Sequence, residues 1–393
     1  MTSKEWKTYK LSDFMEFNPR ETLAKGTIAK KIAMENLQPF CRDVCQYEYA
    51  PYNGGVKFKN GDTIMARITP CLENGKTSKI NILEEDEIAF GSTEYIVFRK
   101  RDNISDENFI YYLVTSPKIR EIAIKSMVGS SGRQRVQVDV LANLELELPP
   151  LETQEKIACV LSSLDDKIEL NNKINQNLEQ QAQAIFKSWF VDFENPKRKT
   201  CKAEEYFSIS IGKTPPRKEP EWFSLNSIDR KWVSISDMGN CGVFILNSSE
   251  YIKDSAIDKF NIVLVPKDTV ILSFKLTVGR VAITNEEMTT NEAIAHFKTD
   301  NKKIKEYLYC YLKNYNFQTM GSTSSIATAV NSKIIKSMPF IIPTDDKIEK
   351  FHQVAKFIFE KIRINQIENE KLTQLRDTLL PKLMSGEIDV DKI

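Results

Sequence analysis

The sequence contains few of the side chains on which catalytic and metal centres are usually built. Its 393 residues include only two histidines, His296 and His352, so acid–base or nucleophilic catalysis by histidine has few candidates. The seven cysteines are odd in number and scattered, which favours reduced thiols over a disulfide framework. Cys41 and Cys45 form the only close pair, and without a nearby histidine they do not indicate a zinc site.

Long apolar runs and a strong charge of either sign are also missing. No apolar segment approaches the length that spans a bilayer, and the first ten residues do not resemble a signal peptide, so we expect a cytoplasmic protein without membrane contact. The 55 basic and 54 acidic residues leave a net charge of +1. This balance argues against a stand-alone nucleic-acid binder, because counterion release requires clustered lysine and arginine. The length indicates two to three domains.

Two segments carry the apolar pattern of one long helix each. No proline or glycine interrupts the chain from Leu151 to Glu194, which predicts a helix of about ten turns, roughly 50 Å at about 1.5 Å per residue. The same pattern returns 194 residues later, between Lys347 and Leu380. The predicted seam residues are Ile157, Leu161, Leu164, Ile168, Asn171, Asn175, Leu178 and Ile185 in the first helix, and Phe351, Ile358, Ile362, Asn365, Asn369, Leu372 and Leu379 in the second.

This seam favours pairing of the two helices. It is a strict stripe with steps of three and four, narrower than the face that a helix usually buries in a domain core, so we interpret the helices as an antiparallel coiled coil. An asparagine that meets another across such a seam costs stability but fixes register and orientation. The alternative is that each helix packs only on its own domain.

The segments that precede the two helices also repeat. The first is predicted to contain short strands, including Thr63 to Ile68 and Glu94 to Phe98, and one helix over Glu107 to Ser126. Tripeptides of the first segment have similar counterparts in the second: Asp62-Thr63-Ile64 and Asp268-Thr269-Val270, Ser92-Thr93-Glu94 and Thr290-Asn291-Glu292, and Gly129-Ser130-Ser131 and Gly321-Ser322-Thr323. A period of this length indicates duplication of a whole domain. We therefore predict an α+β protein with pseudo-twofold symmetry, in which mixed α/β domains at 1–150 and 196–346 alternate with long helices at 151–195 and 347–393.

Several segments resemble one known family. They are Gly61–Lys76 (GDTIMARITPCLENGK), Gly91–Tyr95 (GSTEY), Gly212–Arg217 (GKTPPR), Trp232–Met238 (WVSISDM), Ile185–Phe193 (IFKSWFVDF) and Leu379–Glu387 (LLPKLMSGE). In this order they look like the target-recognition domains and connectors of type I restriction–modification specificity subunits. The resemblance covers essentially the whole chain and includes its duplicated layout.

The resemblance implies a non-catalytic subunit that recognises a bipartite site in double-stranded DNA, one half per recognition domain, with the gap set by the coiled coil. It also implies docking of two modification (methyltransferase) subunits and of restriction subunits. S-adenosylmethionine, ATP and Mg²⁺ are then expected on those partners, and this chain binds none of them. One alternative is the specificity subunit of a type IIB/IIG-like system, whose partner fuses methyltransferase and nuclease. Another is a coiled-coil adaptor without a DNA role.

Base recognition requires side chains that donate or accept hydrogen bonds at base edges, such as arginine toward guanine and asparagine or glutamine toward adenine. The DNA-binding candidates are Arg67, Thr69, Lys76, Ser92, Thr93, Arg133, Gln134 and Arg135 in the first domain, and Ser273, Lys275, Thr277, Arg280, Thr290, Asn291, Ser322 and Thr323 in the second. Arg133 and Arg135 are the strongest candidates, because they flank Gln134 where the sequence shows no capping or ion-pair requirement. A polar loop is often only a turn, so each residue also has a purely structural alternative.

No catalytic centre or metal site is predicted. The chain lacks a GxxxxGK[ST] loop, a GxGxxG placed after a strand, and the Asn/Asp-Pro-Pro-aromatic motif expected of an adenine methyltransferase. Asp165-Asp166-Lys167 resembles a nuclease's acidic-x-Lys triplet only superficially, and its place on a predicted helix favours solvated ion pairs. A self-contained DNA-modifying enzyme is therefore not supported.

Overall fold

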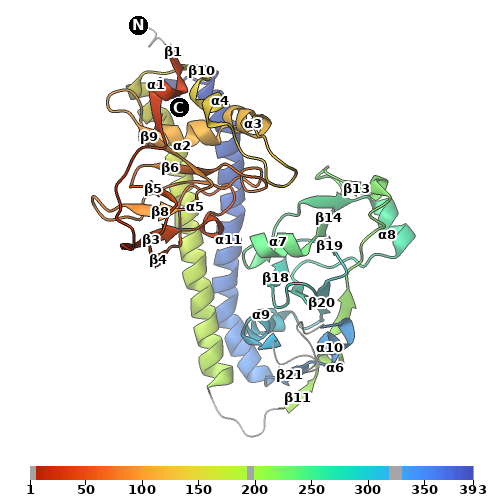
Figure 1. Ribbon diagram of the computed structural model, residues 1–393. Coiled ribbons are helices and arrows are strands. Elements are labelled where there is room, and N and C mark those ends of the chain that lie inside the picture. Colours follow the sequence, from red (N-terminus) through yellow and green to blue (C-terminus); the bar gives the residue numbers. More distant parts are fainter. Residues whose placement is uncertain (1–5, 193–198, 318–329, 393) are drawn as a thin grey trace. The chain divides into compact units, whose positions relative to one another are not determined.

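The computed structural model describes residues 6–192, 199–317 and 330–392. The chain divides into two compact units. Unit 1 comprises Met1–Ile168 and Lys371–Ile393, and unit 2 comprises Glu169–Glu370. The division falls inside both long helices, α5 (Leu151–Phe186) and α11 (Asp345–Met384), so each unit contains a globular part and a stretch of both helices (Figure 1).

The described residues of unit 1 form three small sheets. Their strands are β1 (Lys7–Lys10), β2 (Met15–Phe17), β3 (Ile28–Ile32), β4 (Glu48–Pro51), β5 (Val56–Phe58), β6 (Thr63–Ala66), β7 (Thr77–Lys79), β8 (Ala89–Gly91), β9 (Tyr95–Lys100) and β10 (Glu145–Leu148). They pair in the orders β1-β10, β2-β9-β6-β7 and β4-β3-β8-β5. The strands predicted at 63–68 and 94–98 are confirmed as β6 and β9, apart from their ends.

The helices of unit 1 correct one prediction. They are α1 (Leu11–Phe14), the short η1 (Met34–Asn36), α2 (Glu107–Thr115), α3 (Pro117–Lys125), α4 (Val138–Ala142) and η6 (Val390–Lys392), besides parts of α5 and α11. The single helix predicted from Glu107 to Ser126 is wrong, because the chain breaks at Ser116, whose ψ of 145° is extended. A residue before proline avoids the helical region, and Pro117 then starts the next helix at a position that needs no N–H donor.

The main core of unit 1 joins residues from both ends of the chain. Leu380, Leu383 and Val390 are buried together with Leu11 and Leu161. The core is therefore complete only when the segment after 371 packs against the first globular part.

Asp165 in α5 belongs to this packing, contrary to the solvated ion pair that the sequence predicts. It is only 6% exposed, accepts a hydrogen bond from the Tyr112 hydroxyl at 2.6 Å and pairs with Arg376 Nη1 at 2.7 Å. The prediction fails because the partners lie 53 and 211 residues away in the sequence. The neighbouring Asp166 is exposed and pairs with Arg42 at 2.5 Å.

Unit 2 repeats this topology. Its strands are β11 (Lys199–Lys202), β12 (Ser208–Ile211), β13 (Phe223–Ser224), β14 (Arg230–Val233), β15 (Phe244–Ile245), β16 (Glu250–Ile252), β17 (Val270–Ser273), β18 (Val281–Thr284), β19 (Thr289–Thr290), β20 (Ile294–Lys298) and β21 (Pro339–Ile342). The pair β11-β21 matches β1-β10, and the run β12-β20-β17-β18 matches β2-β9-β6-β7, with β15 added at its edge. The parallel pair β14-β19 matches β3-β8. This agreement confirms the predicted duplication.

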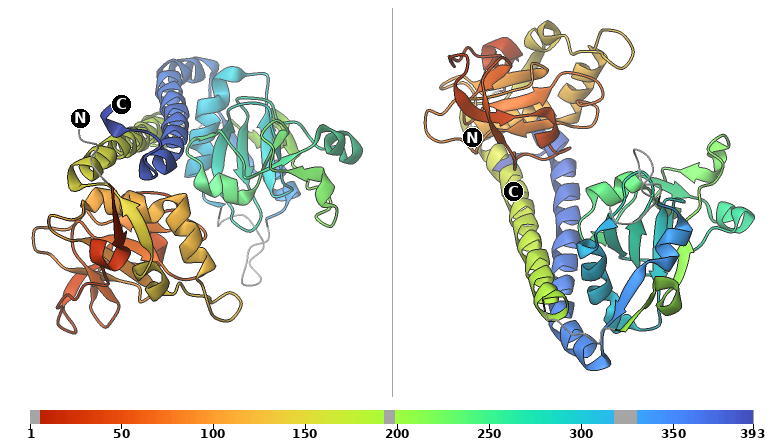
Figure 2. Two further views of the ribbon diagram at one scale, coloured as in Figure 1. Left: turned by 90° about the horizontal axis from the view of Figure 1, so that it is seen from above. Right: turned by 60° about the horizontal axis from the view of Figure 1, so that its bottom comes forward.

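Unit 2 also contains several short helices. They are the π-helical turn η2 (Lys187–Val191), α6 (Ala203–Tyr206), η3 (Pro220–Trp222), α7 (Ile235–Asn240), α8 (Asp254–Phe260), η4 (Lys302–Ile304), α9 (Lys305–Asn314) and α10 (Ser332–Ser337), besides parts of α5 and α11. In the views of Figures 1 and 2, α9 lies between the sheet and the long helices of this unit. Tyr309 of α9 accordingly stacks edge-on against Phe359 of α11 and donates a hydrogen bond to Glu179 of α5 at 2.7 Å. This helix thus holds the sheet on both long helices.

The predicted seam residues all face the interior to some degree. Six are buried, namely Ile157, Leu161, Asn171, Phe351, Ile362 and Asn365, and the other nine are intermediate, namely Leu164, Ile168, Asn175, Leu178, Ile185, Ile358, Asn369, Leu372 and Leu379. In unit 2, Asn171 Nδ2 donates to Asn369 Oδ1 at 2.9 Å, and Asn365 Nδ2 donates to Asn175 Oδ1 at 2.8 Å. The four seam asparagines therefore pair with one another between the two helices of this unit. Both helices begin near their predicted starts, while the predicted end of the first, at Asn195-Pro196, lies outside the described residues.

Across the described ranges, no helix is both long and apolar enough to cross a membrane.

Candidate nucleic-acid interface

Three segments of unit 1 converge where β6 ends. They are the residues after β6, the turn between β8 and β9, and the segment between α3 and α4. Arg135 forms antiparallel bridges with both Ile68 and Val128. Thr69 donates its backbone N–H to Gln134 O at 3.0 Å, and Thr69 Oγ1 accepts the Gln134 N–H at 2.9 Å. The fold thus brings together candidates that lie up to about 70 residues apart in the sequence.

Glu94 is the centre of this convergence, which we call the Glu94 cluster: Arg67, Glu94 and Arg135. Arg135 donates to the carboxylate through Nε at 3.0 Å and through Nη2 at 2.6 Å, and Arg67 Nε lies 3.4 Å from Oε2. The hydrogen bond from Arg135 lowers the pKa of Glu94, so the carboxylate is charged at neutral pH. The three side chains are 33%, 21% and 41% exposed in sequence order, so the cluster is open to solvent. One acid between two arginines leaves a net charge of +1 with fixed donors.

The other candidates of unit 1 differ in their surroundings. Thr93 and Arg133 are exposed, and within the described residues the Arg133 guanidinium has no hydrogen-bond or ion-pair partner. Ser92 Oγ accepts the Glu94 N–H at 3.1 Å and so shapes the turn before β9. Lys76 Nζ donates to the carbonyl of Met34 at 2.8 Å, which commits this ammonium to the scaffold.

Gly129 is required by the close approach of the loop to itself. Its φ of +137° is in a region that other residues rarely adopt, and a Cβ there would lie 2.8 Å from the carbonyl oxygen of Arg133. Gly129 therefore serves the geometry of this turn. The turn returns the chain so that Gln134 bonds to Thr69 and Arg135 pairs with Ile68.

In unit 2, the loop that joins β17 to β18 corresponds to the residues between β6 and β7 of unit 1. Ser273 is buried, donates to Thr277 O at 2.5 Å and accepts the Arg280 N–H at 3.1 Å, so it closes the loop from inside. Lys275 and Thr277 are exposed on either side of Leu276, which is 96% exposed. Arg280 turns away and donates to the Ile235 carbonyl at 2.5 Å. Lys275 and Thr277 are therefore the candidates of this loop that solvent reaches most freely.

Two further candidates of unit 2 precede β20. Thr290 is buried, and its Oγ1 lies 2.7 Å from Nε2 of the buried His296. Asn291 is half-buried, and its Oδ1 accepts the Ala293 N–H at 3.1 Å. The first serves the interior, and the second shapes a turn at the surface.

Glu94 and Glu292 are not among the residues predicted from the sequence. Glu292 is exposed and accepts a hydrogen bond from the Thr214 hydroxyl. Burial opposes the shift, but this hydrogen bond, with the nearby Lys275 and Arg217, lowers the pKa of Glu292. Each acid is the last residue of one of two matching tripeptides, Ser92-Thr93-Glu94 and Thr290-Asn291-Glu292. The repeat in the sequence could therefore have identified both glutamates as candidates.

The remaining candidates and cofactor predictions can be placed only in part. Ser322 and Thr323, like the predicted counterpart of Gly129 at Gly321, lie outside the described residues. Within residues 6–192, 199–317 and 330–392, no group of three or more His, Cys, Asp or Glu side chains is arranged to hold a metal ion. The two loop regions offer hydrogen-bond donors and acceptors at a surface, which suits recognition of a polar ligand such as the edges of base pairs.

Comparison with known proteins points to one family, that of type I restriction enzyme specificity subunits. The family model of the type I restriction modification DNA specificity domain matches residues 3–180 and again 197–377. The chain is 26% identical to the type I restriction enzyme HindI specificity subunit of Haemophilus influenzae, over 98% of this chain and all of that protein. It is 28% identical to the MjaIX specificity subunit of Methanocaldococcus jannaschii, over 75% of this chain and 71% of that one.

A solved structure has a similar fold. The S subunit of a type I restriction–modification system from M. genitalium superposes with a TM-score of 0.54, at 16% identity, over 98% of this chain and 97% of that one. The two matches to the family model fall on the two copies of the repeat.

Proposed function

The chain belongs to the family of type I restriction modification DNA specificity domains, and from this membership we propose that it is the subunit that selects the DNA sequence in a methyltransferase and endonuclease complex. The observation that carries the proposal is the duplication, because the family model matches each copy separately. Specificity subunits are non-catalytic, and the chemistry belongs to their partners. This chain accordingly binds neither S-adenosylmethionine nor ATP.

The recognised site is split in two, with one half for each globular part. Unit 1 would contact its half through the Glu94 cluster, Thr69, Thr93, Arg133 and Gln134. Unit 2 would use the loop that contains Lys275 and Thr277, together with Asn291 and the segment around Ser322 and Thr323. An arginine that donates twice to guanine O6 and N7 is the commonest specific contact in the major groove. The different side chains of the two regions support two different half-sites.

The gap between the half-sites is set by α5 and α11 acting as an antiparallel coiled coil. The hydrogen bonds from Asn171 to Asn369 and from Asn365 to Asn175 in unit 2 support this arrangement. Residue numbers rise along α5 as those of the bonded residues fall along α11, which is the pattern of antiparallel helices. All of the seam residues are buried or half-buried, which supports it as well. A buried asparagine layer would fix the register of the pair and hence the spacer length.

The partners follow from the repeat. Two similar copies offer two equivalent docking surfaces, which supports one modification subunit on each and a stoichiometry of two. Restriction subunits would join for cleavage. The net charge of +1 supports a need for basic partners that contribute phosphate contacts. We place the complex in the cytoplasm, where it has access to chromosomal DNA.

The test is a map of methylated adenines in cells that express the chain with its genomic neighbours, read by long-read sequencing. We expect one bipartite motif with a fixed gap, and its disappearance when the chain is deleted. An unsplit motif, or a split motif that persists after deletion, contradicts the proposal. The adaptor hypothesis would then take its place.

A further inference from the structure

The edge of the five-stranded sheet in unit 2 faces a helix instead of another strand. β15 is the last strand of this sheet and pairs on one side with β18. On that side, Val243 O accepts the Ile283 N–H at 2.9 Å and Ile245 O accepts the Asn285 N–H at 3.2 Å. Successive residues of a strand direct their backbone groups to alternate sides, so the N–H and C=O of Phe244 point outward. Backbone N–H and C=O groups that lack a partner at an edge strand can pair with another chain and so promote aggregation.

Gln366 of α11 satisfies both groups of Phe244. Its Nε2 donates to Phe244 O at 3.0 Å, and its Oε1 accepts the Phe244 N–H at 3.0 Å. A primary amide has the donor and acceptor of a peptide group, so this one side chain takes the place of a neighbouring strand. Gly242 allows the close approach, because a Cβ there would lie 2.8 Å from Gln366 Nε2.

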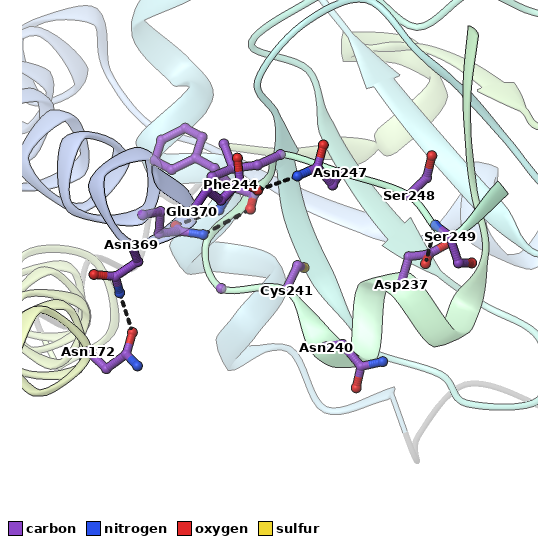
Figure 3. A pocket seen from close by; sticks show the side chains of 13 residues that line it. Asn172, Asp237, Asn240, Cys241, Phe244, Asn247, Ser248, Ser249, Asn369 and Glu370 are labelled. Atoms are coloured by element: carbon purple, nitrogen blue, oxygen red, sulfur yellow. Dashed lines mark hydrogen bonds between the residues drawn. The ribbon is translucent and has the colours of Figure 1, made fainter. Parts of the chain in front are cut away.

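Two neighbours on the same helix face extend the contact. Arg363 stacks its guanidinium over the Phe244 ring, 4.3 Å from the centroid, and pairs with Asp268. Glu370 Oε1 accepts a hydrogen bond from Asn247 Nδ2 at 2.6 Å, as Figure 3 shows. Positions 363, 366 and 370 are three and four residues apart, so they share one face of the helix. We call this set of three side chains the α11 bracket.

The bracket lies beside a hollow. A cavity of about 430 Å³, lined by residues that include Asn172, Asp237, Asn240 and Ser248, opens between the helices and the end of β15 (Figure 3). Gln366 and Glu370 line it as well. The side chains of Phe244 and Ile245 are buried in the cores of unit 2, whereas the outward backbone groups of Phe244 have Gln366 as their partner beside this cavity.

Unit 1 is fastened to its helix by different chemistry. There, Arg42 donates to Ser162 O at 3.3 Å and to Asp166 Oδ1 at 2.5 Å, both on α5. The residue 194 positions before Gln366 is Asn172, which instead accepts a hydrogen bond from Asn369 at 2.8 Å. The bracket is thus a property of the second copy.

We propose that Gln366 is a positioning residue for DNA recognition, and that the α11 bracket fixes the pose of the second recognition sheet on its helix. This inference rests on the proposed function. The bracket contacts no base; it decides where along the duplex the second half-site must lie. Loss of the bracket relaxes the selection of the gap and leaves the selection of bases unchanged.

The experiment compares Gln366→Met with the wild type in the purified complex with its modification subunits. Methionine keeps the length of the side chain and removes both hydrogen bonds. Gln353→Met is the matched control, because Gln353 is exposed on the same helix and, among the described residues, its side chain bonds only to Glu349 of that helix, at 3.3 Å. Initial methylation rates are measured on duplexes with the native gap, with a gap one base pair longer or shorter, and with one base changed in the second half-site.

For Gln366→Met we expect the rate ratio of native to altered gap to fall about tenfold, the size of effect that loss of such hydrogen bonds produces. The ratio of native to substituted half-site should stay within about twofold, and Gln353→Met should match the wild type in both ratios. An unchanged gap ratio, or a parallel fall of both ratios, overturns the inference. If Gln366→Met yields no folded complex, Asn247→Ala removes the Glu370 contact alone and must lower the gap ratio. A wild-type complex without any gap preference would instead refute the proposed function itself.

Discussion

Arg135 shows how an arginine that looks free in the sequence acquires a partner on folding. It is a predicted DNA contact because the nearby sequence shows no ion-pair requirement. The structure gives it Glu94, which lies 41 residues earlier. The carboxylate holds the guanidinium in one orientation, and a held side chain loses less conformational freedom when it meets a base.

Replacing Arg135 by alanine tests its role in recognition. We expect Arg135→Ala to weaken or alter one half of the methylated motif by about 1–3 kcal/mol, or roughly tenfold or more in modification rate, because a good bidentate contact contributes that much discrimination. Arg133→Ala should affect the same half. The measurement is the methylated motif in cells that carry each variant.

The control for these arginines is Arg20→Ala, which removes an exposed arginine next to Glu21, the partner of Arg99. It should leave both halves of the motif intact. If Arg135→Ala weakens both halves equally, Arg135 does not recognise bases within one unit.

His296 provides a pH-dependent test of unit 2. Burial, with a smaller effect of Lys298, lowers the pKa of His296 to about 3, against about 6.5 in an unfolded chain. The unfolded state therefore binds the extra proton, and the stability that the neutral ring contributes is complete above pH 6.5 and is lost as the pH falls toward 3. Between pH 7.5 and 5 the free energy of unfolding should fall by about 2 kcal/mol.

Denaturant unfolding at these two pH values measures this loss. His296→Gln should lack it, whatever its own stability, because glutamine does not titrate. His352→Gln replaces the only other histidine and should keep it. An equal fall in wild type and His296→Gln would show that the loss comes from other groups.

At the scale of elements, the long helices were the most predictable part of the chain. Their pattern repeats over many turns and depends on residues close in sequence, which is the condition under which periodicity predicts structure. The break at Pro117 could also have been predicted, because proline restricts the residue before it. The β-strands of two to six residues were harder, because their partners lie far away and each strand carries little pattern of its own.

The seam asparagines allow a test of register. Asn365 is fully buried and bonds to Asn175. Asn365→Leu alone should lower the free energy of unfolding by about 1–3 kcal/mol, because it leaves the Asn175 amide without its partner. The double variant Asn175→Leu/Asn365→Leu should regain or exceed wild-type stability, since an apolar seam is more stable than a polar one.

Thermal and denaturant unfolding is measured for the wild type, Asn175→Leu, Asn365→Leu and the double variant. The four free energies of unfolding give the coupling free energy between the two residues. Additive effects of the two substitutions would contradict the pairing of Asn175 with Asn365. The same variants should also broaden the range of accepted gaps, because the polar layer that fixes register is gone.

At the scale of the whole molecule, the proposed spacer makes a prediction about DNA. Removing one heptad from each long helix should shorten the spacer by about 10 Å, at about 1.5 Å per residue, and so shorten the gap by about three base pairs. The half-site sequences should not change. The methylated motif of the shortened chain, mapped as for the wild type, checks this. Changed half-sites with an unchanged gap would refute the spacer model.

The recognition regions mark the limit of what the sequence could predict. It predicted the segments that supply candidate residues, and in unit 1 most of them converge around Glu94. It did not predict which of them the scaffold uses: Lys76 bonds to a backbone carbonyl and Thr290 to a buried histidine. Gln366 was missed altogether, because its role depends on a strand edge 122 residues earlier. Contacts of this range are properties of the fold.

Unit 1 has a core that the first part of the chain does not complete. Leu380, Leu383 and Val390 fill it, and Trp6 packs against Gly386. During synthesis, the first recognition region therefore emerges from the ribosome before its core is complete. The core stays incomplete while more than 200 further residues are added. Contacts of such long range form slowly and leave apolar surface exposed in the meantime. A chain cut short by a premature stop would leave this region unstable and open to proteolysis, so truncated copies would be cleared before they could direct modification to half of a site.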